Sequence, residues 1–412
     1  MILKKLSQIL FSTRLTAILF LVFAIAMAAG TFIEDAYNTV TARALIYNSW
    51  WFEAIMGFFL INFIGNIDKY RLLRKEKWAT LTLHLAFILI ILGAFITRYF
   101  GFEGMMPIRE GSTENVFYSD NTFLTVYIDG KINGEPKRRI VPKEKLLLST
   151  EADNHFKIKT DYNGKPVTIE YVDYILAAKE TFQPNEKAPL TLKIVGTGSK
   201  GREEVFIKEG ETKLIANMPF AFNNMTDGAI NILYKNNDYE ILSPFPGGYM
   251  RMADQLTGNL IQDSIQPLML RSLYNIANIQ FVIPELAAKG NVVLKQAEKP
   301  TQADEDALLV DVTADGTTKR VTLMGAKGTI KNPTAIKIND LDINLHYGSV
   351  QYQLPFAIKL NDFIATKYPG TENGYSSYES KVTVVDGTEK FDYKIYMNHV
   401  LDRKGYRFFQ SS

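Results

Sequence analysis

The chain has 412 residues, of which 47% are hydrophobic, with 46 basic and 44 acidic side chains and no cysteine. Its length predicts more than one domain, because single hydrophobic cores stop growing at about 250–300 residues. The nearly balanced charge argues against a nucleic-acid partner, which needs a concentrated basic face. The absence of cysteine excludes disulfide scaffolds, thiol nucleophiles, Cys-type zinc sites and iron–sulfur clusters.

Three apolar runs within residues 1–102 predict three transmembrane helices, at about 15–33, 50–67 and 79–97. Each run meets the requirement of about 20 residues for a helix that crosses roughly 30 Å of hydrocarbon. The first run could instead be the core of a cleaved signal peptide, since Ala26-Met27-Ala28 has the small-residue pattern of a cleavage site. Its length, greater than that of a usual signal core, favours a retained span.

The distribution of basic residues predicts the orientation. Lys4, Lys5 and Arg14 precede the first span, and the loop at 68–78 between the second and third spans carries five basic and two acidic residues. The positive-inside rule assigns both segments to the cytoplasm. Everything after residue 97 is then expected outside, as a large extracytoplasmic domain of a multi-pass membrane protein.

Residues 103–412 show the period-two alternation and the Asn-Gly or Asp-Gly pairs of β-hairpins. The clearest hairpin runs from 156 to 171 around Asn163-Gly164. After Pro267, the run LMLRSLYNIA has apolar residues three and four apart, which predicts a short amphipathic helix. The expected fold is thus three N-terminal transmembrane helices followed by a β-rich, mainly antiparallel domain with one or two short helices.

A polar stretch at about 295–306 (KQAEKPTQADED) predicts the boundary between two β-rich lobes, at 103–295 and 306–412. Four histidines occur in the chain, and none has a second metal ligand at the usual sequence spacing. For the three exterior ones, His155, His346 and His399, a structural role is favoured. The sequence contains no Gly-rich phosphate loop, G-x-S-x-G elbow or H-E-x-x-H pattern, so the exterior domain carries no local enzyme signature.

His84 is the principal candidate, because an ionisable group inside a span is costly unless it faces protein, water or a ligand. It lies five residues inside the third span, about 7–8 Å below the cytoplasmic boundary. Asn62 of the second span reaches a similar depth, with Asn66 one turn nearer the surface. Two interpretations remain open: a His–Asn hydrogen bond that holds the bundle together, or a ligand site in which neutral imidazole is an axial ligand of haem iron.

Several segments resemble the ResB-like (CcsB) family, the membrane component of the System II, or Ccs-type, cytochrome c assembly machinery. The resemblance covers most of the chain and rests on the order and spacing of four segments: YNSWWFEAIMGFFLINFIGNI, LTLHLAFILIILGAFITRYFGFEGMMPIREG, LPFAIKLNDFIATKYPG with SYESKVTV, and YKIYMNHVLDRKGYRFFQSS. It implies a bacterial inner-membrane protein with a periplasmic β domain. Together with a CcsA-type partner, such a protein is thought to move haem b across the membrane to apocytochrome c.

The resemblance also implies a role for His84 as one of two axial haem ligands, with the other supplied by the CcsA part. The family has a further transmembrane helix after the exterior domain, so the chain is expected to be a fragment or the leading part of a fused synthase. The tryptophan-rich haem-handling motif of the partner is absent. We therefore expect a non-catalytic portion of the cytochrome c haem lyase, which assists haem attachment without carrying the attaching site.

Two other function classes stay open. A membrane-anchored extracytoplasmic binding or signalling module would use the spans as mere anchors and would not handle haem. An extracytoplasmic hydrolase would need a carboxylate pair that only the fold could assemble.

Overall fold

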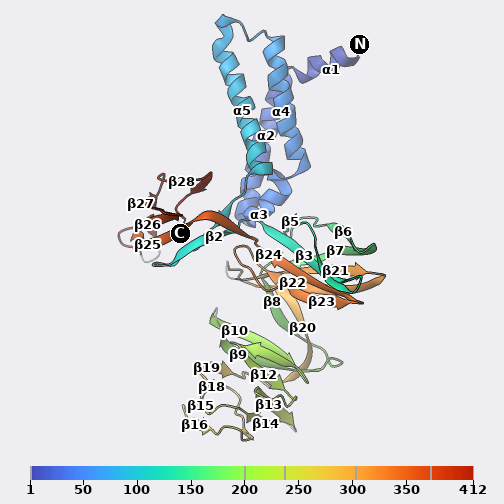
Figure 1. Cartoon of the computed structure of the whole chain (residues 1–412), viewed down its shortest axis with the longest axis vertical. Coiled ribbons are helices and arrows are strands. Elements are labelled where there is room, and N and C mark those ends of the chain that lie inside the picture. The colour runs from blue at the N-terminus through green and yellow to red at the C-terminus, as the bar shows by residue number, and fades with distance from the viewer. Residues whose placement is uncertain (1, 199–200, 236–237, 302–303, 372–373, 412) are drawn as a thin grey trace. The chain divides into compact units, whose positions relative to one another are not determined.

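The computed structural model describes residues 2–198, 201–235, 238–301, 304–371 and 374–411. The chain divides into two compact units (Figure 1). The first unit contains Met1–Tyr174 and Asp306–Ser412, and the second contains Ile175–Glu305. The first unit has both helices and sheets, and the described part of the second has sheets alone. The expected order, three apolar helices followed by a large and mostly antiparallel β domain, is confirmed.

All helices of the described residues lie before residue 101. They are α1 (Ile2–Leu10), α2 (Thr13–Ala36), α3 (Thr39–Ala42), the π-helix η1 (Arg43–Tyr47), α4 (Trp50–Lys69), the 3₁₀-helix η2 (Lys75–Lys77) and α5 (Trp78–Phe100). Three helical segments are long and apolar enough to cross a membrane: Thr13–Ala36, Trp50–Lys69 and Lys75–Phe100. α2, α4 and α5 begin and end within three residues of the predicted spans.

Serine caps fix where two of the long helices begin. The Ser12 side chain accepts a hydrogen bond from the Leu15 amide at the start of α2, and Ser49 accepts one from Phe52 at the start of α4. Gly65 of α4 allows the ring of Phe11, from the α1–α2 junction, to pack directly on the helix backbone, where any Cβ would collide with it. α1 is thereby held against α4, and the two are in contact.

The first unit contains three main sheets and a C-terminal pair of strands. In the first sheet the strand order is β1 (Gly104–Met105), β2 (Thr113–Ser119), β25 (Gln351–Lys367), β26 (Tyr375–Asp386) and β27 (Glu389–Tyr396). In the second it is β23 (Thr334–Ile338), β24 (Leu341–Gly348), β3 (Thr122–Ile132) and β4 (Glu135–Ile140), with β5 (Glu144–Leu146) also paired to β3, and in the third it is β22 (Thr317–Gly325), β21 (Asp306–Ala314), β7 (Lys165–Ile175) and β6 (Lys157–Tyr162). The C-terminal pair is β28 (Leu401–Arg403) and β29 (Tyr406–Phe408).

The predicted hairpin at 156–171 is confirmed as β6 paired antiparallel with β7. Its turn residues, Asn163 and Gly164, have φ angles of 52° and 79°. Two successive positive φ angles are what a two-residue type I′ turn requires, and Asn-Gly adopts them at low cost. The local sequence therefore determines this element.

The division into units differs from the predicted lobes at 103–295 and 306–412. The second unit does end at Glu305, inside the polar stretch, of which residues 302 and 303 lie outside the described part of the chain. The predicted first lobe is nevertheless split at residue 174, because β7 pairs with β21 in one sheet. The second unit is therefore an insertion between two neighbouring strands of the first.

A buried polar contact joins the strands on either side of this insertion. The Tyr174 hydroxyl donates to the Asp306 carboxylate at 2.8 Å, and the Tyr174 side chain is buried. Burial raises the pKa of Tyr174, so the phenol stays protonated and remains a donor. Tyr174 and Asp306 are the last and first residues of the first unit on the two sides of the insertion.

We expect Tyr174→Phe to lower the free energy of unfolding by about 1–3 kcal/mol, because it removes a hydrogen bond to a charged group and leaves the carboxylate partly desolvated. Thermal unfolding of the purified chain in detergent measures this change. Tyr368→Phe is the matched control, since Tyr368 is largely exposed. Equal unfolding temperatures for Tyr174→Phe and the unmodified chain would contradict the role given to this contact.

The second unit is built from two sheets around one core. The larger sheet has the strand order β16 (Thr257–Leu260), β15 (Gly247–Arg251), β18 (Ser272–Ile276), β19 (Ile279–Val282), β9 (Leu190–Gly198), β20 (Ala288–Gln296) and β8 (Ala178–Pro184), and β10 (Gly201–Lys208) also pairs with β9. The smaller sheet has the strand order β11 (Thr212–Ile215), β12 (Met218–Phe222), β13 (Ile230–Lys235), β14 (Asp238–Leu242) and β17 (Gln266–Pro267). Its core is rich in Phe, Ile and Tyr, including the fully buried Phe220, Phe222 and Tyr274.

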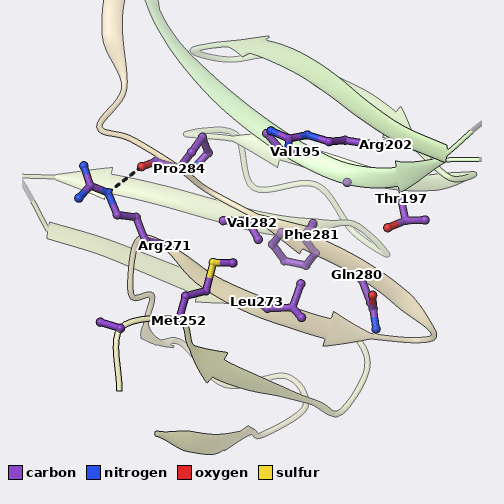
Figure 2. A pocket seen from close by; sticks show the side chains of 12 residues that line it. Val195, Thr197, Arg202, Met252, Arg271, Leu273, Gln280, Phe281, Val282 and Pro284 are labelled. Atoms are coloured by element: carbon purple, nitrogen blue, oxygen red, sulfur yellow. Dashed lines mark hydrogen bonds between the residues drawn. The ribbon is translucent and has the colours of Figure 1, made fainter. Parts of the chain in front are cut away.

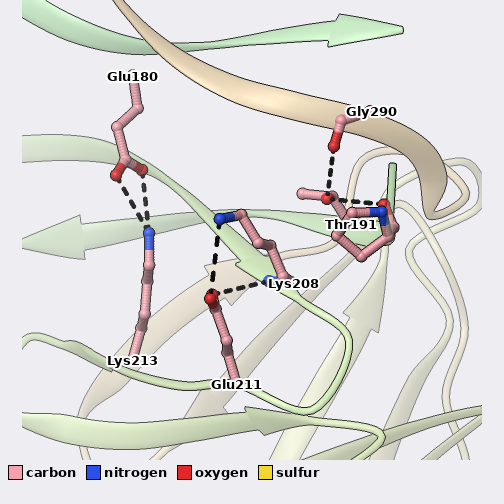
Figure 3. A network of polar contacts seen from close by, with 7 residues as sticks. Glu180, Thr191, Lys208, Glu211, Lys213 and Gly290 are labelled. Carbon is pink, nitrogen blue, oxygen red and sulfur yellow. Dashed lines mark hydrogen bonds and ion pairs between the residues drawn. The ribbon is translucent and has the colours of Figure 1, made fainter. Parts of the chain in front are cut away.

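Polar contacts at the edges of these sheets connect β8 to β11 (Figure 3). Lys213 pairs with both oxygens of Glu180 at 3.1 and 3.3 Å. Close by, the Thr191 hydroxyl lies 3.3 Å from the Gly290 carbonyl, between β9 and β20. These side chains connect strands that are distant in sequence. Their arrangement is not that of a catalytic site.

The prediction of an amphipathic helix after Pro267 is wrong: residues 272–276 form strand β18. Arg271 has a φ angle of 55°, which a right-handed helix cannot accommodate. In β18 the residues alternate, with Ser272, Tyr274 and Ile276 buried and the two between them less so. Pairing with β15 and β19 overrides the local spacing. No helix occurs among the described residues after Phe100, so the predicted short exterior helices are not found there.

The connector between α2 and α4 contacts the loops between strands of its own unit. The Thr41 and Ser149 hydroxyls form a buried hydrogen bond of 2.8 Å. Arg43 lies 3.5 Å from the Asp120 carboxylate, which also pairs with Lys327 at 2.5 Å. The helical and β-rich parts of the first unit are therefore joined by specific polar contacts as well as by the chain itself.

Candidate functional site

The strongest candidate site lies where α4 and α5 pack together (Figure 1). On α5, His84, Phe87, Ile88 and Ile91 recur at the three- and four-residue spacing of one helix face. Phe87, Ile88 and Ile91 pack against the buried core that α2 and α4 share. His84 continues this face toward the η2 end of α5, where its ring meets Phe63 of α4.

The His84 imidazole is oriented by its own helix. Its Nδ1 lies 2.9 Å from the carbonyl oxygen of Thr80. A carbonyl only accepts hydrogen bonds, so Nδ1 carries the proton and Nε2 keeps its lone pair in the neutral ring. No described residue hydrogen-bonds to Nε2, and the side chain is half-buried. This arrangement, with one ring nitrogen held by a carbonyl and the other available, is the one that metal-ligating histidines adopt.

Aromatic rings form an apolar surface beside the imidazole. Phe63 meets His84 edge-on at 5.6 Å and stacks on Phe87 at 5.1 Å, with their planes 8° apart. Phe59 stacks on Phe63 at 5.7 Å, and Phe20 of α2 meets Phe59 edge-on at 4.8 Å. Such a surface suits contact with a flat, largely apolar molecule.

Asn62 has a different environment, at the junction of α1 and α2. Its Nδ2 donates to the carbonyls of Leu10 and Ser12 at 2.6 and 3.2 Å. Its Oδ1 accepts from the Thr16 hydroxyl at 2.7 Å and from Nδ2 of Asn66 at 2.9 Å. Asn62 is fully buried and uses both donors and both lone pairs of its amide.

The predicted neighbours Asn62 and His84 are therefore not brought together by a hydrogen bond. The residue after Asn62, Phe63, is the one whose ring contacts His84. Successive residues of a helix point about 100° apart, so similar depth does not imply the same face. Among the described residues, Asn62 holds helices together, whereas Nε2 of His84 lacks a protein hydrogen bond.

A polar cluster holds the start of α4 against the end of α5. Arg98 donates to the Glu53 carboxylate at 2.5 Å and to the Tyr47 carbonyl at 2.8 Å, and the Tyr99 hydroxyl donates to Glu53 at 2.5 Å. The sequence marks Glu53 as the lone charge of its span, but its partners Arg98 and Tyr99 follow 45 and 46 residues later. In two neighbouring antiparallel spans, the start of one helix lies beside the end of the other. Applied to the second and third spans, this geometry would have predicted the pairing of Glu53 with Arg98.

The exterior histidines make local contacts. Nδ1 of His155 lies 3.0 Å from the Asp153 carbonyl, in its own turn. Nδ1 of His399 lies 2.7 Å from the Lys394 carbonyl, and its ring stacks on Tyr396 at 4.6 Å. Across the part of the chain that the structure describes, no three His, Asp or Glu side chains gather as a metal site. These observations agree with structural roles for His155 and His399.

The second unit contains a hollow of about 690 Å³ (Figure 2). Leu273 and Phe281 lie in its middle, with Arg271 and Gln280 toward its two ends. Its described lining includes no carboxylate and no histidine. General acid–base hydrolysis relies on such groups, so this hollow gives no support to a hydrolase.

Comparisons with known proteins agree with the resemblance seen in the sequence. A model of the ResB-like family matches residues 323–412. Protein NrfI of Wolinella succinogenes is 25% identical over 397 residues, which is 96% of this chain and 30% of that protein. The chain therefore spans about a third of the length of this relative. The C-terminal segments that suggested the family lie inside the matched region, and the resemblance to the ResB-like family is confirmed.

Proposed function

We propose, with the match to the ResB-like family as the premise, that this chain takes part in cytochrome c maturation as a component of the haem attachment complex. It helps haem, its cargo, to cross the membrane and reach apocytochrome c, together with a CcsA-type partner. The proposal places the chain in the bacterial inner membrane, with the basic α4–α5 loop in the cytoplasm and the β domain in the periplasm.

The observation that carries this proposal is the state of His84. Its Nδ1–H is engaged by the Thr80 carbonyl, its Nε2 has no described protein partner, and aromatic rings lie beside it. Haem iron takes a neutral imidazole nitrogen as an axial ligand, and the porphyrin plane favours apolar and aromatic surroundings. His84 would hold the iron from one side, and Phe63 would border the macrocycle.

The exposed side of α5 supports a partner in the membrane. α5 contains no buried residue, whereas six residues of α4 are buried. Large apolar side chains such as Leu89, Ile90 and Ile96 are therefore left for lipid or for the helices of another protein. A single histidine supplies one axial ligand, and a partner that packs against α5 would supply the second.

Deletion of the gene, followed by haem staining of denatured membrane proteins, tests the function. We expect covalently labelled c-type cytochromes to fall below detection and to return when the chain is supplied on a plasmid. Apocytochrome should remain detectable by antibody. A variant whose three spans are replaced by unrelated ones is expected not to restore staining. Normal staining in the deletion strain would contradict the proposal, and restoration by the span-swapped variant would favour a simple anchored binding module.

A further inference from the structure

A second hollow, of about 310 Å³, lies over one face of the β3–β24 ladder in the first unit. Thr125 and His346 are directly opposite each other in this antiparallel pair. Opposed residues project to the same face, so both side chains point to one side of the sheet. Residues after β4, β22 and β24, including Lys143, Ile330 and Val350, add to the lining. These segments cover this part of the sheet face and leave the hollow open to solvent on one side, where Lys143 and Ile330 are exposed.

The hollow contains a buried hydroxyl without a partner. Thr125 is only 5% exposed, and its Oγ1 makes no hydrogen bond. Leaving a buried hydroxyl unpaired costs about 1–3 kcal/mol, so such groups in native proteins are rare and usually have an explanation. Valine at this position would have the same shape without that cost. The hydroxyl is therefore a feature that packing alone does not account for.

The imidazole opposite Thr125 offers a second donor. Nε2 of His346 accepts a hydrogen bond from the Lys331 backbone amide at 3.3 Å. Nε2 is therefore unprotonated, and the neutral ring carries its proton on Nδ1, for which the described residues provide no hydrogen bond. Burial lowers the pKa of His346, which keeps the ring neutral at pH 7. This Nδ1–H is a donor in need of an acceptor.

The charge of the lining favours an anion. Lys143 lines the hollow and forms no ion pair with a described residue, and the described lining contains no Asp or Glu. The donors of the lining include the Lys143 ammonium, the Thr125 hydroxyl and the His346 Nδ1–H. A carboxylate, with two oxygens and no donor of its own, complements them. Ile330, Pro333 and Val350 offer apolar surface for a short carbon chain.

We propose that this hollow binds a short-chain organic carboxylate, with its charge at Lys143 and Thr125 and its carbon chain against Ile330 and Val350. The volume lies at the lower end of the range for small-molecule sites, which limits the ligand to a few carbon atoms. The site is independent of His84 and of the haem-handling function proposed above.

Isothermal titration calorimetry of the purified full chain in detergent, with butyrate as the titrant, tests the site. We expect saturable binding of butyrate and none of 1-butanol, which has the same chain without the charge. Thr125→Val and Lys143→Gln should each raise the Kd at least about fivefold, since each removes a hydrogen bond to a charged oxygen. Lys131→Gln is the matched control, because Lys131 is exposed on the same strand and does not line the hollow.

Three outcomes would overturn the proposal: no saturable heat with butyrate at millimolar concentrations, an unchanged Kd in Thr125→Val, or equal affinity for inorganic phosphate, which would indicate an unspecific anion site. Thr125→Val keeps the shape of the side chain and removes an unpaired hydroxyl, so it should unfold at an equal or higher temperature than the unmodified chain. Lys143→Gln changes an exposed side chain and gives a second, independent reading.

Discussion

Replacing His84 by alanine is expected to remove most of the haem absorption of membranes that contain this chain with its partner. The Soret band should weaken at least about tenfold per unit of protein, because an axial ligand of the haem iron is lost. Added imidazole should restore the band, since it brings the same donor nitrogen into the space that the side chain leaves. Absorption spectra before and after imidazole measure both effects.

Two controls separate ligation from folding in this experiment. His155→Ala removes a histidine that bonds only its own turn, and it should leave the Soret band unchanged. The amount of His84→Ala protein in the membrane should equal that of the unmodified chain, because the imidazole makes its one hydrogen bond within its own helix. An unchanged band in His84→Ala would refute the ligand role, and a weakened band that imidazole cannot restore would point to a structural effect.

Replacing Asn62 by leucine is expected to destabilise the helical part by about 2–4 kcal/mol. The substitution keeps the number and branching of the side-chain heavy atoms but removes four hydrogen bonds, among them those to the Leu10 and Ser12 carbonyls. It also leaves Nδ2 of Asn66 without its acceptor, in a residue whose Oδ1 is already unpaired. Thermal unfolding in detergent, followed by circular dichroism at helical wavelengths, measures the loss.

Thr31→Val serves as the control for Asn62→Leu, because the Thr31 hydroxyl bonds only to the carbonyl four residues before it in the same helix. Haem absorption per folded molecule should stay normal in Asn62→Leu, the reverse of the pattern expected for His84→Ala. An unfolding temperature unchanged by Asn62→Leu would contradict the structural role. The two substitutions together test whether the two polar residues of the spans have separate tasks.

The apolar helices and the hairpin at Asn163-Gly164 were predictable because local physics decides them. Membrane-spanning length requires an uninterrupted apolar run, and Asn-Gly adopts two positive φ angles more easily than other pairs. Depth within a span also follows from counting residues, and this placed Asn62 and His84 at similar levels. The face that each residue presents depends on how helices pack, which one helix alone does not reveal.

Strand partners were the part of the fold that sequence could not provide. Alternation marks a strand but does not say which strand lies next to it, and β7 and β21 are separated by the whole second unit. The helix prediction for the run after Pro267 was wrong for the same reason, since pairing with β15 and β19 decided the conformation of this run. The hollow beside Thr125 and His346 is likewise formed by segments more than 200 residues apart.

The insertion of the second unit between β7 and β21 has an evolutionary consequence. Its two ends leave from neighbouring strands, and Tyr174 contacts Asp306 across the joint. A tight turn could connect the end of β7 directly to the start of β21. We therefore expect that homologous chains can lengthen, shorten or lose the second unit while the first unit keeps its strand order. Sequence divergence should therefore concentrate at 175–305, and alignments of relatives should tolerate large gaps there without disturbing residues 323–412.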